Sequence, residues 1–230
     1  MVGTARLSLA HLIREPRVPA AGRAPLLLLL HGVGSHERDL FQLAPALDPR
    51  FFIVSARGPL VLAPGAFAWF HVTFTPRGPA IVAAEAEASR ERLRAFLAEL
   101  AVAYPVDPQR VYLLGFSQGA IMSFSVALTA PERVAGVVAL SGRILPEIRP
   151  LIAPPAALAG LPFLVIHGTE DTVLPVSYGR AARDLLAGLP VALTYREYPM
   201  GHQITADSLS TVAAWLTAQL DAAELPATVD

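Results

Sequence analysis

Seven strand candidates, most of them continuous apolar runs, are separated by stretches with helical periodicity, and this alternation restricts the chain to one class of fold. The candidates lie at residues 5–13, 26–31, 51–56, 110–116, 134–140, 162–167 and 191–198. Continuous apolar runs of this length are typical of strands that are covered on both faces. Between them, apolar residues recur at helical spacing within 93–100 and again within 209–220. We therefore expect an α/β fold, with a mostly parallel central sheet of about seven strands and helices on both faces.

The composition favours one hydrophobic core. Of the 230 residues, 53% are hydrophobic, which is enough apolar material for a single domain over residues 1–230. The apolar runs are much shorter than the roughly twenty residues that a membrane-spanning helix needs. Residues 1–20 carry scattered charges and lack the continuous apolar stretch of a secretory signal. The sequence thus predicts a cytoplasmic location and no membrane partner.

The charge balance and the missing residue types exclude several kinds of function. The net charge is -1, and acids and bases are mixed along the chain, so nothing predicts a nucleic-acid partner. Cysteine, lysine and asparagine are all absent. A thiol nucleophile, a disulfide, a cysteine metal site, a Schiff-base lysine and a phosphate-loop lysine are therefore impossible. We expect a small-molecule substrate, no cofactor and no metal, and a monomer or a homodimer.

Two long segments interrupt the alternation of strands and helices. Residues 57–79 are rich in glycine, proline and aromatics, and residues 142–160 are rich in proline and alanine. Each follows a predicted strand, and in open α/β sheets the ligand lies outside the carboxyl ends of the strands. We expect the first segment to form a pocket wall. The second is equally well explained as a loop that only packs on the surface.

The motif Gly115-Phe116-Ser117-Gln118-Gly119 carries the strongest chemical signal. It stands directly between an apolar run and an alanine-containing apolar stretch, which predicts a strand, a sharp turn and a helix. Such a turn raises the serine hydroxyl above the sheet, and the helix directs its first amides toward the same place. Ser117 is thus the predicted nucleophile. The competing interpretation is a glycine-rich turn that contains a serine by coincidence.

A serine nucleophile needs a base, and the base needs a carboxylate to orient it. His202 is the best-placed base, because it follows the last predicted strand and precedes the final helix. Asp171 lies between nucleophile and base in the chain, just after the predicted strand 162–167. We expect Asp171 to be the orienting residue. Its neighbour Glu170 remains the alternative, since spacing cannot separate the two.

The other five histidines have less specific predicted roles. His31 and His167 end predicted strands and precede glycines, so we expect both to be structural imidazoles near the site. His36 and His71 lie in predicted loops, where they either contact substrate or face solvent. His11 is expected at the surface or at a sheet edge.

A tetrahedral intermediate of acyl transfer also needs hydrogen-bond donors for its oxyanion. The backbone amide of Gln118, next after the nucleophile, is the first candidate. The second is the amide of Val33, within His31-Gly32-Val33-Gly34, where glycines let the backbone come close to a ligand. The alternative is a tight turn that needs these glycines only for its own conformation.

The order of these motifs resembles the phospholipase/carboxylesterase group of α/β-hydrolases. The resemblance extends over nearly the whole chain: HGVGSHERDLF from His31, ARGPL from Ala56, PGAFAWF from Pro64, GFSQGA from Gly115, LSGRILP from Leu140, HGTEDTVLP from His167 and MGH from Met200. It implies an α/β-hydrolase fold without a lid domain, a triad of Ser117, Asp171 and His202, and esters or thioesters as substrates. Two residues depart from the pattern. His71 stands where an acid is expected, and Arg143 where related sequences often have an aromatic or apolar residue.

These observations predict a serine carboxylesterase that hydrolyses esters with short to medium acyl chains, with thioesters and lysophospholipids as possible further substrates. The residues expected to bind substrate are Phe67, Trp69, Phe70, His71, Arg143, Ile144, Leu145, Val173 and Leu174. An acyltransferase or perhydrolase would use the same triad. A non-catalytic protein that binds a small ligand is the third interpretation, although it would have no use for nucleophile, base and orienter together.

Overall fold

The predicted strands form one mixed sheet in the computed structural model, which describes residues 7–18, 22–76 and 78–224. The sheet has seven strands in the order β1-β3-β2-β8-β9-β10-β11 within this part of the chain. Their bounds are β1 (His11–Arg14), β2 (Ala24–Leu30), β3 (Phe52–Ala56), β8 (Val106–Phe116), β9 (Gly136–Leu140), β10 (Pro162–Gly168) and β11 (Ala192–Tyr198). Within this sheet only β1 runs antiparallel to its neighbour, and the other strand pairs of the sheet are parallel. The prediction of a mostly parallel sheet is confirmed.

The first strand lies later in the chain than the sequence predicts. The apolar run was expected to pair over residues 5–13, of which 5 and 6 lie outside the described residues. The strand instead begins at His11 and pairs with β3. One reason is that the backbone N–H of Ser8 donates to the carboxylate of Glu99, at 2.7 Å, and not to a neighbouring strand. His11 lies at the sheet edge, where its Nε2 is 2.7 Å from the Tyr104 hydroxyl.

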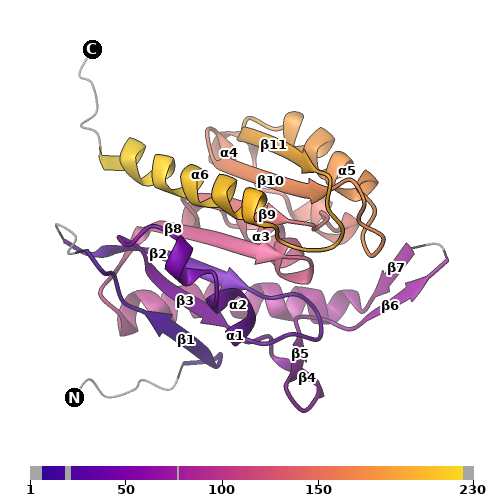
Figure 1. Cartoon of the computed structure of the whole chain (residues 1–230), viewed down its shortest axis with the longest axis horizontal. Coiled ribbons are helices and arrows are strands. Elements are labelled where there is room, and N and C mark those ends of the chain that lie inside the picture. The colour runs from indigo at the N-terminus through magenta and orange to yellow at the C-terminus, as the bar shows by residue number, and fades with distance from the viewer. Residues whose placement is uncertain (1–6, 19–21, 77, 225–230) are drawn as a thin grey trace.

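Helices cover both faces of the sheet (Figure 1). The helices are α1 (Arg38–Phe41), α2 (Ala83–Ala103), α3 (Gln118–Thr129), α4 (Pro155–Leu158), α5 (Ser177–Ala187) and α6 (Ala206–Glu224). Helices α1 and α6 pack on one face, while α2, α3, α4 and α5 pack on the other. Short 3-10 helices lie between these elements: η1 (Ala44–Ala46), η2 (Pro131–Arg133) and η3 (Pro146–Leu151). No helix of the described residues is both long and apolar enough to cross a bilayer.

Strand β2 shows why the central runs are continuously apolar. Leu26, Leu28 and Leu30 face the core under α2 and α3, whereas Leu27 and Leu29 face the core under α6. All five side chains are fully buried. Because each face of this strand is covered, neither set of alternate positions can be polar.

The long segment after β3 is more regular than the sequence indicates. It contains two antiparallel ribbons, β4 (Leu60–Ala63) with β5 (Ala66–Ala68), and β6 (Val72–Thr75) with β7 (Gly78–Ile81). Both ribbons project beyond the carboxyl ends of the parallel strands (Figure 1). The two ribbons therefore lie beside the strand ends at which the candidate site is found.

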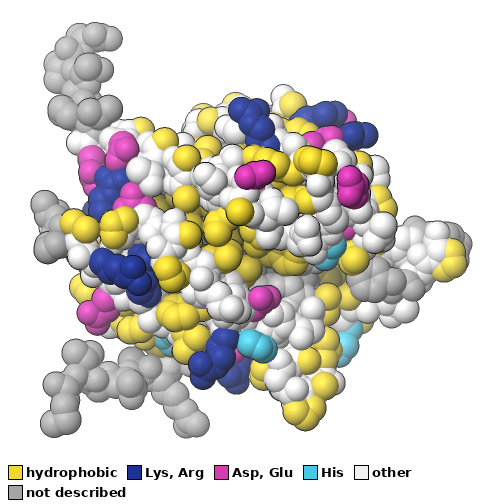
Figure 2. Space-filling view, viewed as in Figure 1, with side chains coloured by type: hydrophobic (Ala, Val, Ile, Leu, Met, Phe, Trp, Pro, Cys, Tyr) yellow, Lys and Arg dark blue, Asp and Glu magenta, His cyan; other side chains and the backbone are white. Residues whose placement is uncertain are grey.

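Charged side chains form no large patch of one sign on the face that carries α6. Acidic and basic groups lie interspersed there, with apolar side chains exposed between them (Figure 2). This mixture agrees with the near-zero net charge of the chain.

Candidate active site

Ser117 occupies a strained turn at the junction of β8 and α3. Its backbone has φ 54° and ψ -115°, in a region that non-glycine residues seldom adopt. The glycines on either side are needed because other backbone lies close to them. A Cβ atom on Gly119 would lie 1.8 Å from the carbonyl oxygen of Leu30, and one on Gly115 would lie 2.2 Å from that of Gly119. The strand, turn and helix expected around this serine are therefore present.

The structure brings Ser117, His202 and Asp171 into one hydrogen-bonded chain. Nε2 of His202 is 2.9 Å from the Ser117 hydroxyl oxygen, and Nδ1 is 2.7 Å from Asp171 Oδ2. A proton on Nδ1 can be donated only to the carboxylate. In that tautomer Nε2 has a free lone pair, so it can accept the serine proton.

Of the two neighbouring acids, Asp171 is the one beside His202. Its side chain is fully buried, and Oδ1 accepts the backbone N–H groups of Val173 and Leu174 at 2.9 and 2.8 Å. These bonds leave Oδ2 to face the imidazole. Glu170 is exposed, and its backbone N–H donates to the carbonyl of Met200.

His31 fixes the orientation of the peptide that precedes the Val33 amide. The backbone N–H of Gly58 donates to His31 Nε2 at 2.9 Å, so the ring proton is on Nδ1 and is donated to the Gly32 carbonyl at 2.7 Å. In a trans peptide the C=O and N–H groups point in opposite directions. The Val33 N–H therefore points away from His31. Burial lowers the pKa of His31, which keeps this imidazole neutral.

His167 is a second buried, neutral imidazole. Its Nε2–H donates to the Leu174 carbonyl at 2.7 Å, and the same nitrogen lies 3.5 Å from Asp171 Oδ2. Burial lowers its pKa as well. Both strand-end histidines thus lie in the interior close to the site, and each supports one of its loops.

The side chain of Gln118 joins the nucleophile turn to the segment that precedes β6. Its Oε1 accepts the backbone N–H of Trp69 at 2.7 Å, and its Nε2 donates to the Phe70 carbonyl at 2.6 Å. Gln118 is buried, so these bonds are protected from water. The position of Phe70 is thereby tied to that of Ser117.

A cavity of about 290 Å³, its open mouth included, begins at Ser117. Its lining consists of Val33, Phe70, Val72, Pro79, Ile81, Ser117, Gln118, Ile121, Arg143 and Leu174. The wall is therefore mostly apolar, and Arg143 is its one charged side chain among the described residues. His202 contributes to a separate hollow, which is lined by Asp39, Leu40, Gln42, Leu43, Phe116, His202, Gln203 and Ile204.

Three of the nine expected substrate-binding residues line the cavity: Phe70, Arg143 and Leu174. Trp69 and Leu145 do not, and the side chains of both pack in the core. The Trp69 indole N–H donates to the carbonyl of His31 at 3.0 Å. Ile144 packs against the same core.

The remaining three expected residues, Phe67, His71 and Val173, also lie outside the cavity. The backbone N–H of Phe67 donates to the Ser35 carbonyl, and the Arg57 guanidinium covers its ring at 4.5 Å. His71 is exposed and lies 2.8 Å from the carboxylate of Glu85. The side chain of Val173 is 43% exposed, because this residue turns outward beside Asp171.

Segment 57–79, expected to form a pocket wall, contributes Phe70, Val72 and Pro79 to the cavity. Sequence reasoning did not name four of the individual lining residues: Val72, Pro79, Ile81 and Ile121. Ile121 follows Ser117 by one helical turn, and this spacing could have identified it. The other three come from the ribbon β6–β7, whose pairing has no clear signal in the sequence.

The described residues contain no cluster of three or more histidine, cysteine, aspartate or glutamate side chains that could hold a metal ion. The polar side chains that meet at the site are those of Ser117, His202 and Asp171, and Arg143, Val33 and Gln118 line the cavity beside Ser117.

Comparison with known proteins gives a consistent set of relatives. The sequence model of the phospholipase/carboxylesterase family matches residues 12–220. Acyl-protein thioesterase 1 of Gibberella zeae is 34% identical over 118 residues, which are 50% of this chain and 50% of that protein. The chain thus spans about half the length of such curated relatives.

Two solved structures are similar over almost their whole length. Esterase PE8 has a TM-score of 0.77 and 29% sequence identity, covering 91% of this chain and 98% of its own. A carboxylesterase from Mesorhizobium loti has a TM-score of 0.77 and 26% identity, covering 92% and 96%.

Proposed function

The chain belongs to the phospholipase/carboxylesterase family, and from this premise we propose that it hydrolyses carboxylic esters or thioesters through an acyl-enzyme on Ser117. The observation that carries the proposal is the chain of hydrogen bonds from Ser117 through His202 to the buried Asp171. A binding protein needs no such chain. A serine nucleophile does, because its hydroxyl is unreactive at neutral pH without a base.

In the proposed reaction, Nε2 of His202 accepts the hydroxyl proton while the Ser117 oxygen attacks the carbonyl carbon. Asp171 stabilises the imidazolium that forms and holds the ring in the required tautomer. His202 then gives the proton to the departing alkoxide or thiolate. Water attacks the acyl-enzyme in the second half, with His202 again as the base, and this step restores Ser117.

The backbone amides of Val33 and Gln118 are the proposed donors to the oxyanion. Both residues line the cavity beside Ser117, and Gln118 is the first residue of α3. The positive end of the helix dipole adds to the stabilisation of negative charge there. His31 supports the arrangement because it holds the Gly32–Val33 peptide in one orientation.

The two hollows suggest how the substrate divides across the site. The leaving group must depart near His202, which protonates it, and the hollow lined by His202 and Phe116 lies on that side. The acyl part then lies in the cavity lined by Val33, Ser117 and Gln118. The cavity reaches about 290 Å³ only when the open space at its mouth is counted, so it is small for a ligand pocket. Short to medium acyl groups are therefore the proposed substrates.

Hydrolysis of a panel of esters, thioesters and lysophospholipids by the wild type and by Ser117→Ala tests this proposal. A series of 4-nitrophenyl esters should show kcat/KM rising by at most roughly fourfold per methylene, since each buried methylene contributes about 0.8 kcal/mol. The rate should fall once the chain exceeds the cavity. A continuous rise to the longest chains would contradict the assigned acyl cavity, and equal activity in Ser117→Ala would contradict the function itself.

A further inference from the structure

Arg143 brings a positive charge into an apolar cavity. It follows β9 closely and lies between the ribbon β6–β7 and helix α5. Its Nη2 donates to the Pro79 carbonyl at 3.2 Å, and its guanidinium carbon is 5.4 Å from the centre of the Tyr178 ring. These two contacts fix the plane of the guanidinium but supply no negative charge.

Within the described part of the chain, Arg143 has no ion pair. Nη1 donates to no described residue, and Nε is buried without a hydrogen-bond partner. By contrast, the buried Arg90 pairs with two carboxylates, and the partly buried Arg50 pairs with three. Burial is the main cause that lowers the pKa of Arg143, while the nearby Glu147 carboxylate acts in the opposite direction without forming an ion pair. An unpaired cation in such a place is costly to stability, which favours a role in binding.

The cavity offers Arg143 no other polar partner. Its further polar residues are Ser117, the proposed nucleophile, and Gln118, whose side-chain amide is already bonded to the backbone of residues 69 and 70. The rest of the lining is apolar. A ligand that extends from Ser117 into this cavity thus meets one charged group, and that group is a cation.

We propose that Arg143 binds a carboxylate on the acyl part of the substrate, so that half-esters or half-thioesters of short dicarboxylic acids are preferred over neutral esters of the same length. The proposal rests on the proposed function, and on the placement of the acyl part in the cavity shared by Ser117 and Arg143. Guanidinium suits this task because it stays charged and presents donors that match a carboxylate.

The test compares two esters of equal chain length, the mono-4-nitrophenyl ester of glutaric acid and 4-nitrophenyl pentanoate. The ratio of their kcat/KM values is measured for the wild type, Arg143→Met, Arg143→Gln and Arg143→Lys. Arg149→Met is the matched control, because Arg149 is an exposed arginine of the same segment outside the cavity. The neutral ester is an internal reference, so a general loss of activity cancels in the ratio.

The ratio should fall about ten- to hundredfold in Arg143→Met and in Arg143→Gln, the effect of losing a charge-assisted hydrogen bond. Arg143→Lys should retain part of the preference, and Arg149→Met all of it. The glutamine side chain keeps an N–H donor for the Pro79 carbonyl but carries no charge. If Arg143→Met does not fold, Arg143→Gln therefore still measures the effect of losing the charge. An unchanged ratio, or an equal loss for both esters, would overturn the proposal. Absence of Ser117-dependent hydrolysis of the neutral ester would instead refute the proposed function.

Discussion

The glycines beside Ser117 show how one residue position can decide whether the site forms. Replacing Gly119 by alanine would place a Cβ atom 1.8 Å from the Leu30 carbonyl oxygen, so α3 and β2 would have to separate. We expect Gly119→Ala to destabilise the protein by about 1–3 kcal/mol or more, as overpacking does in cores. Urea denaturation measures this. Gly188→Ala is the control. A Cβ atom there would lie 3.4 Å from the nearest atom, the Leu185 carbonyl oxygen, so the stability of this variant should hardly change.

The two neighbouring acids give a second prediction at the level of single residues. Asp171→Ala should lower kcat by about four decades, because the imidazole loses the carboxylate that orients it. Glu170→Ala should have little effect, since its side chain is exposed. Steady-state kinetics of both variants on one ester provide the comparison. A larger loss in Glu170→Ala would show that the orienting acid is misassigned.

The sequence alone could identify Ser117, because the motif needs its glycines for reasons of backbone contact. It could not separate Asp171 from Glu170, since the difference lies in how residues 171–174 turn. The Val173 and Leu174 amides hold Asp171 inward, and nothing in the spacing predicts those bonds. Trp69 and Leu145 were assigned to the pocket because large apolar residues look the same in a wall and in a core.

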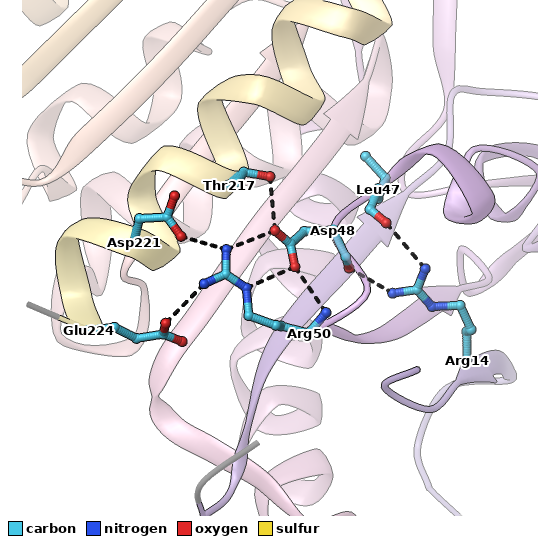
Figure 3. Close-up of polar contacts among 7 residues, drawn as sticks. All are labelled: Arg14, Leu47, Asp48, Arg50, Thr217, Asp221 and Glu224. Atoms are coloured by element: carbon cyan, nitrogen blue, oxygen red, sulfur yellow. Dashed lines mark hydrogen bonds and ion pairs between the residues drawn. The ribbon is translucent and has the colours of Figure 1, made fainter. Parts of the chain in front are cut away.

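At the level of elements, a network of ion pairs fastens the end of α6 to the loop before β3 (Figure 3). Arg50 contacts Asp48, Asp221 and Glu224 at 2.7 to 2.9 Å. Thr217 adds a hydrogen bond to Asp48 at 2.9 Å. Because α6 begins just after His202, this network supports the helix that follows the proposed base.

Removing Arg50 should therefore weaken the packing of α6. Asp48 is buried, and the hydrogen bond from Arg50 lowers its pKa to about 2. In Arg50→Met this carboxylate would keep the hydrogen bond from Thr217 but lose its charged partner, at a cost of about 1–3 kcal/mol in the free energy of unfolding. Within the described residues, Arg133→Met removes only an exposed pair with Glu132 and should cost at most about 1 kcal/mol. Equal effects in urea denaturation would mean that the network contributes nothing beyond surface attraction.

The elements differ in how well their sequence signals could be read. The parallel strands were predictable because strands covered on both faces are continuously apolar, as in β2. The ribbon β6–β7 was not, since short exposed strands have mixed composition and pair only with each other. Strand β1 was placed too early because the apolar run before it is fastened to α2 and not to the sheet.

The buried histidines should make the stability of the whole molecule depend on pH. Burial lowers the pKa of His31 and His167 below the usual value of about 6.5. Below that pH the unfolded chain binds more protons than the folded chain, so the free energy of unfolding decreases as the pH falls. At lower pH, from about 3.8 down to about 2, protonation of Asp48 removes its contribution to the free energy of unfolding as well. Urea denaturation between about pH 8 and pH 5 should show the first decrease, and a flat profile would contradict it.

Covalent labelling by a fluorophosphonate is the sharpest test of the proposed nucleophile, because the reagent requires a serine that has been activated by its neighbours. The wild type should carry a single label, which peptide mass spectrometry places on Ser117. Ser117→Ala should not react, and His202→Ala should react far more slowly because the base is missing. Ser177→Ala, a variant of an exposed serine, should be labelled like the wild type. Labelling of Ser117→Ala at the wild-type rate, or a label on another serine, would contradict the account.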